Sequence, residues 1–266
     1  MSRDWNRRRF LSTFAVAAAV TVAGACSKPG DVAGGREYYE LRSYRVQTAE
    51  KQKALLAYVE SALLPALNRM GLERIGVFTS LDKADDHDVR VLIPFPTLDA
   101  FSGLTPRLEA DPAYLKAAAS HFTGPMKDPP YTRISSQFMK AFVSIPSIEL
   151  PAQTATRQPR IFELRTYESH NEDAARRKVL MFDEGETQLM RDVQLGPVFF
   201  GQMLVGHDVP NLTYMLSATD TKAHKAHWKS FLGHPKWNEM KVLPQYKDTV
   251  SKITKWFLKP TDFSQI

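Results

Sequence analysis

A six-residue pattern that occurs twice constrains this chain more than any other feature. Residues 39–44 read YELRSY and residues 162–167 read FELRTY, so the two glutamates are 163 − 40 = 123 residues apart. At the same offset, without a gap, the apolar positions of a helical stripe, a second strand and a Pro-aromatic turn also correspond. The chain is therefore predicted to contain one folding unit written twice.

Each copy is predicted to form a strand, a long helix, two strands, a helical segment and a final strand. Gly71 is expected to end the first long helix, and Pro65 to kink it. A proline-rich, polar linker at 146–160 separates a first domain at 36–145 from a second at 161–260. In the first copy the elements lie at about 37–46, 49–70, 74–80, 88–95, 98–121 and 133–143.

This order of elements is close to the ferredoxin-like split βαβ plan. A four-stranded antiparallel sheet with helices on one face leaves its other face bare, and two such sheets can cover each other. The sequence thus predicts an α+β fold, a tandem duplication of a ferredoxin-like module whose two antiparallel sheets close a barrel within one chain.

The N-terminus is typical of an export signal at residues 1–26, with a basic start and an apolar run from 10 to 25 that is short for a membrane span. Arg7, Arg8, Phe10 and Leu11 resemble a twin-arginine motif. Two processing outcomes fit Cys26, the only cysteine: cleavage before a lipid-bearing cysteine, or cleavage at a plain small-residue site. The expected location is the periplasm, or the envelope as an anchored lipoprotein.

The repeated opening strand, the tandem copies and the Pro-aromatic step at 112–114 and 235–237 resemble the NIPSNAP family, within the dimeric α+β barrel superfamily. The resemblance covers about residues 36–260. It implies a ferredoxin-like tandem fold and a homodimer or higher homo-oligomer, without a firmly assigned reaction. Relatives in the superfamily include cofactor-free monooxygenases, haem-handling enzymes and isomerases, so an activity drawn from them would rest on analogy of fold.

Charged side chains alternate along both opening strands. The more apolar set suits the helix-covered face, so the polar set is predicted to face the space between the sheets. Two readings fit: a polar cavity that binds an acidic or polar small organic molecule through arginine and tyrosine donors, or a structural ladder of Glu–Arg pairs that closes the barrel. The ligand-binding candidates are Glu40, Arg42, Tyr44, Glu163, Arg165, Tyr167 and Trp228.

Comparison of the copies gives three further candidates for catalysis. His224 and His227 replace Phe101 and Leu104 and share one helix face, so they could supply a base, a haem contact or metal ligands; hydrogen-bonded surface histidines are the alternative. No third ligand has suitable spacing, so no metal site is predicted. Glu186 replaces Leu63 and is either a buried acid with a raised pKa or a helix-edge carboxylate.

Charge and motifs exclude several classes of function. Of the net charge of +6, the first nine residues contribute 4 − 1 = +3, which leaves too little for a nucleic-acid surface. Phosphate-binding glycine loops, nucleophile elbows and cysteine metal knuckles are missing. Three hypotheses follow: a small-ligand-binding protein without a cofactor, a monooxygenase-like or haem-handling oxidoreductase, or a structural module. Membrane contact is expected only through a lipid at Cys26.

Overall fold

The computed structural model describes residues 35–266. The predicted signal at residues 1–26, including Arg7, Arg8, Phe10, Leu11 and Cys26, lies outside the described residues. Among the described helices, none has the length and apolar character needed to cross a membrane.

The first repeat contains four strands, with helices after the first and third. Thr48 begins the long helix by accepting a hydrogen bond from the Lys51 amide, and Gly71, with φ 79°, follows its end as predicted. The elements are β1 (Tyr38–Arg45), α1 (Ala49–Tyr58), η1 (Val59–Leu63), α2 (Leu64–Arg69), β2 (Gly76–Ser80), β3 (Val89–Phe95), α3 (Leu98–Ser102), α4 (Leu104–Glu109), α5 (Pro112–Phe122) and β4 (Arg133–Ala141).

The second repeat follows a short helix and has the same order of elements. Asn171 and Asp220 begin its two long helices by accepting hydrogen bonds from backbone amides. The elements are α6 (Ala152–Thr156), β5 (Ile161–Glu168), α7 (Glu172–Met181), η2 (Phe182–Glu186), α8 (Thr187–Asp192), β6 (Pro197–Val205), β7 (Asn211–Ala218), α9 (Thr221–Gly233), α10 (Pro235–Met240), η3 (Pro244–Tyr246) and β8 (Lys252–Pro260).

A π-helical turn interrupts the long helix of each repeat at the same place. η1 and η2 start at Val59 and Phe182, 182 − 59 = 123 residues apart. Pro65 is the second residue of α2, which continues the helix after η1, so the proline does not end the helix. The second repeat has Gln188 at the equivalent position, so the turn does not depend on a proline.

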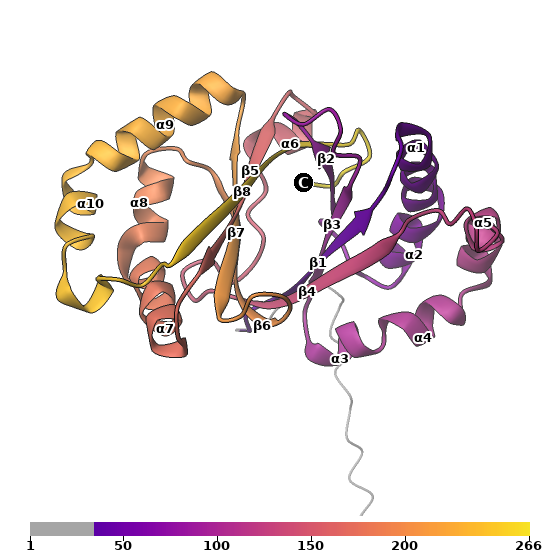
Figure 1. The fold of residues 1–266 in the computed structure, drawn as a ribbon, viewed down its shortest axis with the longest axis horizontal. Coiled ribbons are helices and arrows are strands. Elements are labelled where there is room, and N and C mark those ends of the chain that lie inside the picture. The colour runs from indigo at the N-terminus through magenta and orange to yellow at the C-terminus, as the bar shows by residue number, and fades with distance from the viewer. Residues whose placement is uncertain (1–34) are drawn as a thin grey trace, which may run out of the picture. The chain divides into compact units, whose positions relative to one another are not determined.

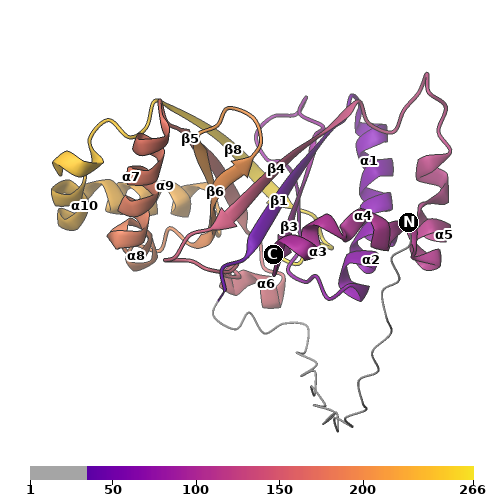
Figure 2. The same ribbon diagram turned by 90° about the horizontal axis from the view of Figure 1, so that it is seen from below.

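The eight strands form one closed antiparallel barrel in the order β1-β3-β2-β8-β5-β7-β6-β4. Each repeat contributes a four-stranded sheet whose last strand pairs with the first strand of its own repeat, β4 with β1 and β8 with β5. The outer edges of these last strands join the two sheets: β4 pairs with β6, and β8 pairs with β2. Helices α1–α5 lie on one side of the barrel and α7–α10 on the other (Figure 1; Figure 2 gives a second view). This arrangement confirms the predicted tandem α+β barrel.

The barrel interior is apolar and is filled from all eight strands. Tyr39 and Leu41 of β1 and Phe162 and Leu164 of β5 lie in one cluster with side chains of the other six strands. Tyr44 and Tyr167 belong instead to the clusters beneath the helices.

The predicted orientation of the opening strands was therefore wrong. The polar rows, Glu40, Arg42 and Tyr44 in β1 and Glu163, Arg165 and Tyr167 in β5, point away from the barrel interior and toward the helices. The alternation of side chains defines two faces of a strand but does not show which face lies inside the barrel. The two facing sheets exclude water from the interior, whereas the layer beneath the helices accommodates paired charges.

Residues 261–266 close one end of the barrel. The Ile266 side chain is fully buried in the interior cluster. The Thr261 and Gln265 amides donate to the carbonyl oxygens of Val77 and Ile75, at 3.0 and 2.9 Å. A segment that follows the second repeat is thus built into the wall contributed by the first.

Candidate functional site

The Glu–Arg pair of the opening strand occurs in both repeats. The Arg42 Nε donates to Glu40 at 2.8 Å, and an Nη of Arg165 donates to Glu163 at 3.3 Å. The Ser136 hydroxyl also donates to Glu40, at 2.7 Å. In the first repeat the pair thus has local partners on neighbouring strands, as the ladder reading expects.

In the second repeat Glu163 has two further partners, both from α9. The Trp228 Nε1 donates to a carboxylate oxygen of Glu163 at 2.8 Å, and the His224 Nε2 is hydrogen-bonded to the same oxygen at 2.9 Å. Burial alone would raise the pKa of the Glu163 carboxyl, but the hydrogen bond from His224 and the charge of Arg165 lower it below the ordinary value. A buried carboxylate therefore binds α9 to the sheet.

Arg165 lies between aromatic rings. Its guanidinium carbon is 4.5 Å from the centre of the Trp228 ring and 5.4 Å from that of Tyr167. This geometry is favourable for cation–π contact. The Nε of Arg165 is buried and has no hydrogen-bond partner among the described residues.

A second ionic pair lies beside the first, between α7 and η2. The Lys178 Nζ donates to Glu186 at 2.6 Å, and the two residues are only 4% and 2% exposed. Burial raises the pKa of the Glu186 carboxyl, and the charge of Lys178 lowers it in part. Of the two alternatives predicted for Glu186, the structure thus confirms the buried acid, and the helix-edge alternative was wrong.

Two tyrosine hydroxyls lie between the ionic pairs. The Tyr214 hydroxyl donates to that of Tyr167 at 2.9 Å, and burial raises the pKa of Tyr214 well above its ordinary value. Tyr214 lies opposite Arg165 in the β5–β7 register, as Val91 lies opposite Arg42 in the β1–β3 register. The strand pairing therefore confirms that the 123-residue offset matches equivalent positions.

That equivalence shows which polar groups the fold does not require. At four buried or half-buried positions, the first repeat has an apolar side chain where the second has a polar or ionisable one. Burying charge costs free energy even when it is paired, and the first repeat packs the same layer without it. The four pairs are Leu55 and Lys178, Leu63 and Glu186, Val91 and Tyr214, and Phe101 and His224.

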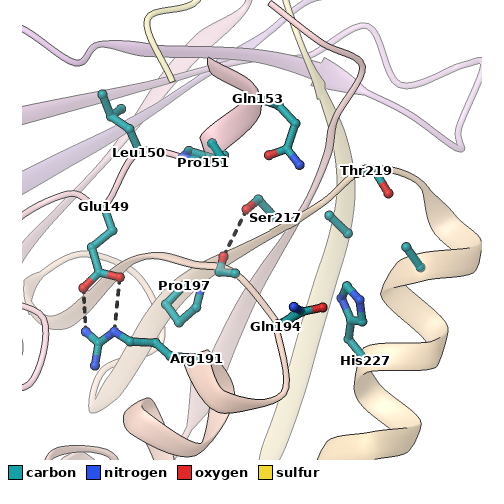
Figure 3. Close-up of a pocket in the computed structure, with 14 residues that line it drawn as sticks. Glu149, Leu150, Pro151, Gln153, Arg191, Gln194, Pro197, Ser217, Thr219 and His227 are labelled. Atoms are coloured by element: carbon teal, nitrogen blue, oxygen red, sulfur yellow. Dashed lines mark hydrogen bonds and ion pairs between the residues drawn. The ribbon is translucent and has the colours of Figure 1, made fainter. Parts of the chain in front are cut away.

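A cleft of about 520 Å³ lies between α9, the end of α8 and the segment that precedes β5. Figure 3 shows Gln194 pointing toward His227, with Ser217 on the strand behind them. The only charged side chains on the cleft wall, Glu149 and Arg191, form an ion pair with contacts of 2.6 and 3.2 Å. The other polar groups are the amides of Gln153 and Gln194, the hydroxyls of Ser217 and Thr219 and the imidazole of His227.

The structure separates the two predicted histidines. His224 points to the sheet and His227 borders the cleft, although they share one helix. Because Glu163 occupies the Nε2 of His224, that nitrogen is unsuited to an axial haem ligand, and His227 is the one histidine of α9 in the cleft. In the described part of the chain, no three His, Cys, Asp or Glu side chains are placed to hold a metal ion.

The sequence analysis missed Lys178, Tyr214 and Gln194. Lys178 and Tyr214 could have been found with the comparison that found Glu186, since Leu55 and Val91 are apolar at the same offset. Gln194 could have been found as the residue that replaces Gly71 after the long helix. The glutamine there adopts φ 61°, a conformation that usually favours glycine.

The fold and the polar layers define a tandem α+β barrel in which both repeats have a Glu–Arg pair beneath the helices, and the second repeat adds His224 and the Lys178–Glu186 pair. The family model described as NIPSNAP matches residues 39–141 and 162–265. The chain belongs to the NIPSNAP family, with one family unit in each repeat. No curated protein matches it.

Solved structures with this fold include two candidate monooxygenases. One, from Lactobacillus acidophilus, is 10% identical with a TM-score of 0.56, over 85% of this chain and 94% of that chain. One from Fusobacterium nucleatum is also 10% identical, with a TM-score of 0.54, over 85% and 93%. A NIPSNAP-like domain protein from Burkholderia xenovorans is 18% identical, with a TM-score of 0.36, over 40% and 88%. At these identities the likeness is one of fold.

Proposed function

We propose that this NIPSNAP-family protein binds a small organic molecule in its second repeat, in the cleft beside α9. One observation carries the proposal: the second repeat buries ionisable groups at positions that the first fills with Leu55, Leu63 and Phe101. Since the apolar version packs the same fold, the buried charges are retained for a role other than folding.

The cleft wall indicates the chemical class of the ligand. Its uncharged polar groups include both donors and acceptors, and Glu149 and Arg191 neutralise each other. A volume of about 520 Å³ suits a small molecule. The ligand is therefore an uncharged molecule that forms several hydrogen bonds, and not the acidic molecule that an unpaired arginine would favour.

The buried network gives this cleft a defined wall. His227 lies three residues from His224 and one from Trp228, both of which bond to Glu163. The position of α9, and with it the imidazole of His227, is thus set by a carboxylate on the sheet. A site outside the barrel is also supported by the barrel interior, which is filled by apolar side chains.

The first test is native mass spectrometry of the protein from its own host, prepared separately from membrane and soluble envelope fractions. A co-purifying small molecule is the expected result. Recovery in the membrane fraction supports the lipid anchor proposed at Cys26, and recovery in the periplasm alone supports plain cleavage. An absorbance spectrum of the same sample tests the haem-handling alternative.

Variants then locate the molecule that co-purifies. His227→Ala is expected to weaken its binding by roughly 0.5–1.5 kcal/mol, the usual contribution of one hydrogen bond. The matched control is His207→Ala, which removes an exposed histidine from the β6–β7 turn. Equal affinity of both variants would exclude the cleft. Protein that is always empty, from either fraction, would support the structural-module alternative.

A further inference from the structure

Lys178 is an amine in an unusual place for a lysine. The residue is 4% exposed, and its ammonium lies 4.4 Å from the centre of the Phe182 ring, with the rings of Tyr167 and Trp237 at 5.6 and 5.8 Å. Its charged partner is Glu186, at 2.6 Å. A lysine desolvated among apolar groups, next to a carboxyl that can exchange a proton with it, has the surroundings of a reactive amine.

The pair is not needed for the π-helical turn. η1 has the same length and position in the first repeat with Leu55 and Leu63 in place of the two charges. Lys178 and Glu186 are eight residues apart, and the turn between them brings their side chains together. The ion pair is therefore an addition of the second repeat to a turn that both repeats have.

The helix that lies over this amine is short. Trp237, whose ring lies over Lys178, belongs to α10, a helix of six residues of which none is fully buried. A second groove of about 540 Å³ runs between α8 and α10 and is lined by Gly185, next to Glu186, and by Met240. Met240 thus borders this groove together with Gly185, the chain neighbour of Glu186, while Trp237 of the same helix lies over Lys178.

We propose that Lys178 is a carbonyl-reactive lysine, which forms an imine with a small aromatic or apolar aldehyde or ketone admitted beneath α10. The three rings around the amine set the apolar, aromatic character of this substrate class. This site is separate from the α9 cleft, and its chemistry requires no ligand there, although both proposals draw on the buried charges of the second repeat.

The chemistry balances with the groups present. The Lys178 ammonium passes one proton to the Glu186 carboxylate, and the free amine attacks the carbonyl carbon to form a C–N bond. The carbonyl oxygen takes up the second amine proton and becomes a hydroxyl. Glu186 then returns its proton to that hydroxyl, which departs as water while the nitrogen lone pair completes the C=N bond. An iminium ion, one water and the Glu186 carboxylate result, with no oxidant or reductant.

The test is reductive trapping in the wild-type full chain. Benzaldehyde and sodium cyanoborohydride convert an imine to a stable benzyl amine, and peptide mapping by mass spectrometry gives the order in which lysines are labelled. Lys178 is expected to be labelled before Lys225 and Lys229, which are exposed on α9. If those two are labelled while Lys178 is recovered unmodified, the inference is wrong.

Glu186→Gln separates reactivity from simple access. It keeps the size of the side chain and removes the proton carrier, so labelling of Lys178 should slow by roughly 10²-fold, the scale of general acid–base catalysis. The rates at Lys225 and Lys229 should not change. Equal rates at Lys178 in both proteins would overturn the role of Glu186, and near-UV circular dichroism checks that the fold is kept.

Discussion

Glu40 and Glu163 occupy equivalent positions, yet their carboxylates have different partners. Glu40 bonds to neighbours on its own sheet, whereas Glu163 bonds to two side chains of α9. A residue can thus stay unchanged between the repeats while the residues around it change its role. The structural-ladder reading describes the first repeat, and in the second repeat the same row also holds α9 through His224 and Trp228.

A double substitution tests whether the charges of Lys178 and Glu186 stabilise the fold. Lys178→Leu alone should lower the free energy of unfolding by about 3–5 kcal/mol, because it leaves a carboxyl buried without its partner. Lys178→Leu with Glu186→Leu restores the side chains of Leu55 and Leu63 and should be neutral or stabilising by up to about 4 kcal/mol. Urea unfolding measures both. A double variant as unstable as the single one would show that the charges are needed for folding.

At the residue scale, the sequence predicted the chemistry of the site better than its geometry. The offset comparison identified His224 and Glu186 as departures from an apolar template. It could not show that Glu163 lies beside His224, because strand and helix are 61 residues apart in sequence. It also could not show which face of β5 is inside, because both faces of that strand are covered.

At the scale of elements, the two long helices end with the same motif but different residues. The Leu72 amide donates to the Leu67 carbonyl at 3.0 Å after Gly71, and the Leu195 amide donates to the Met190 carbonyl at 2.9 Å after Gln194. The motif requires a positive φ, which glycine adopts without strain. Gln194 adopts this strained conformation at the wall of the cleft. Strained backbone conformations are often found at functional sites.

Gln194→Gly should therefore separate stability from binding. The substitution relieves a left-handed conformation that costs about 1–2 kcal/mol and loses roughly 0.5–1 kcal/mol through the greater freedom of the unfolded chain. A net gain of up to about 1.5 kcal/mol is expected, with weaker binding of the co-purified molecule. Thermal unfolding and titration measure the two effects. Gly71→Ala, the reverse change in the first repeat, should destabilise; a destabilised Gln194→Gly would contradict the argument.

Element boundaries followed well from the sequence because caps and duplication both mark them. The long helix predicted at 49–70 is observed at 49–69, and the strand predicted at 88–95 is observed at 89–95. The π-helical turns were not predicted. They leave the apolar stripe on the same face, so no periodicity signals them, although they are what brings Lys178 and Glu186 together.

At the scale of the whole molecule, each repeat completes the sheet of the other. β8 extends the sheet of β2, and β4 extends that of β6. Ile266 fills the shared interior from the segment that follows β8. The tandem sequence allowed the closed barrel to be predicted, but the role of residues 261–266 lies in contacts with the first repeat that no local pattern shows.

Ile266→Ala should consequently affect both repeats. Removing a fully buried isoleucine side chain is expected to lower the free energy of unfolding by about 2–5 kcal/mol. Amide hydrogen exchange should quicken in β2 of the first repeat as well as in β8 of the second. Ile134→Ala, at an exposed position of β4, is the control and should change little. A loss of protection confined to the second repeat would mean that the two sheets unfold separately.

The covalent connection between the two sheets also removes a constraint of symmetry. When identical subunits build a barrel, every substitution enters both halves, so a lysine in place of Leu55 would add two buried charges at once. In this chain a substitution in one repeat leaves the sequence of the other repeat unchanged. The first repeat keeps apolar side chains at the positions of Leu55 and Leu63. The second repeat can carry charged groups at the equivalent positions while the first repeat continues to stabilise the barrel.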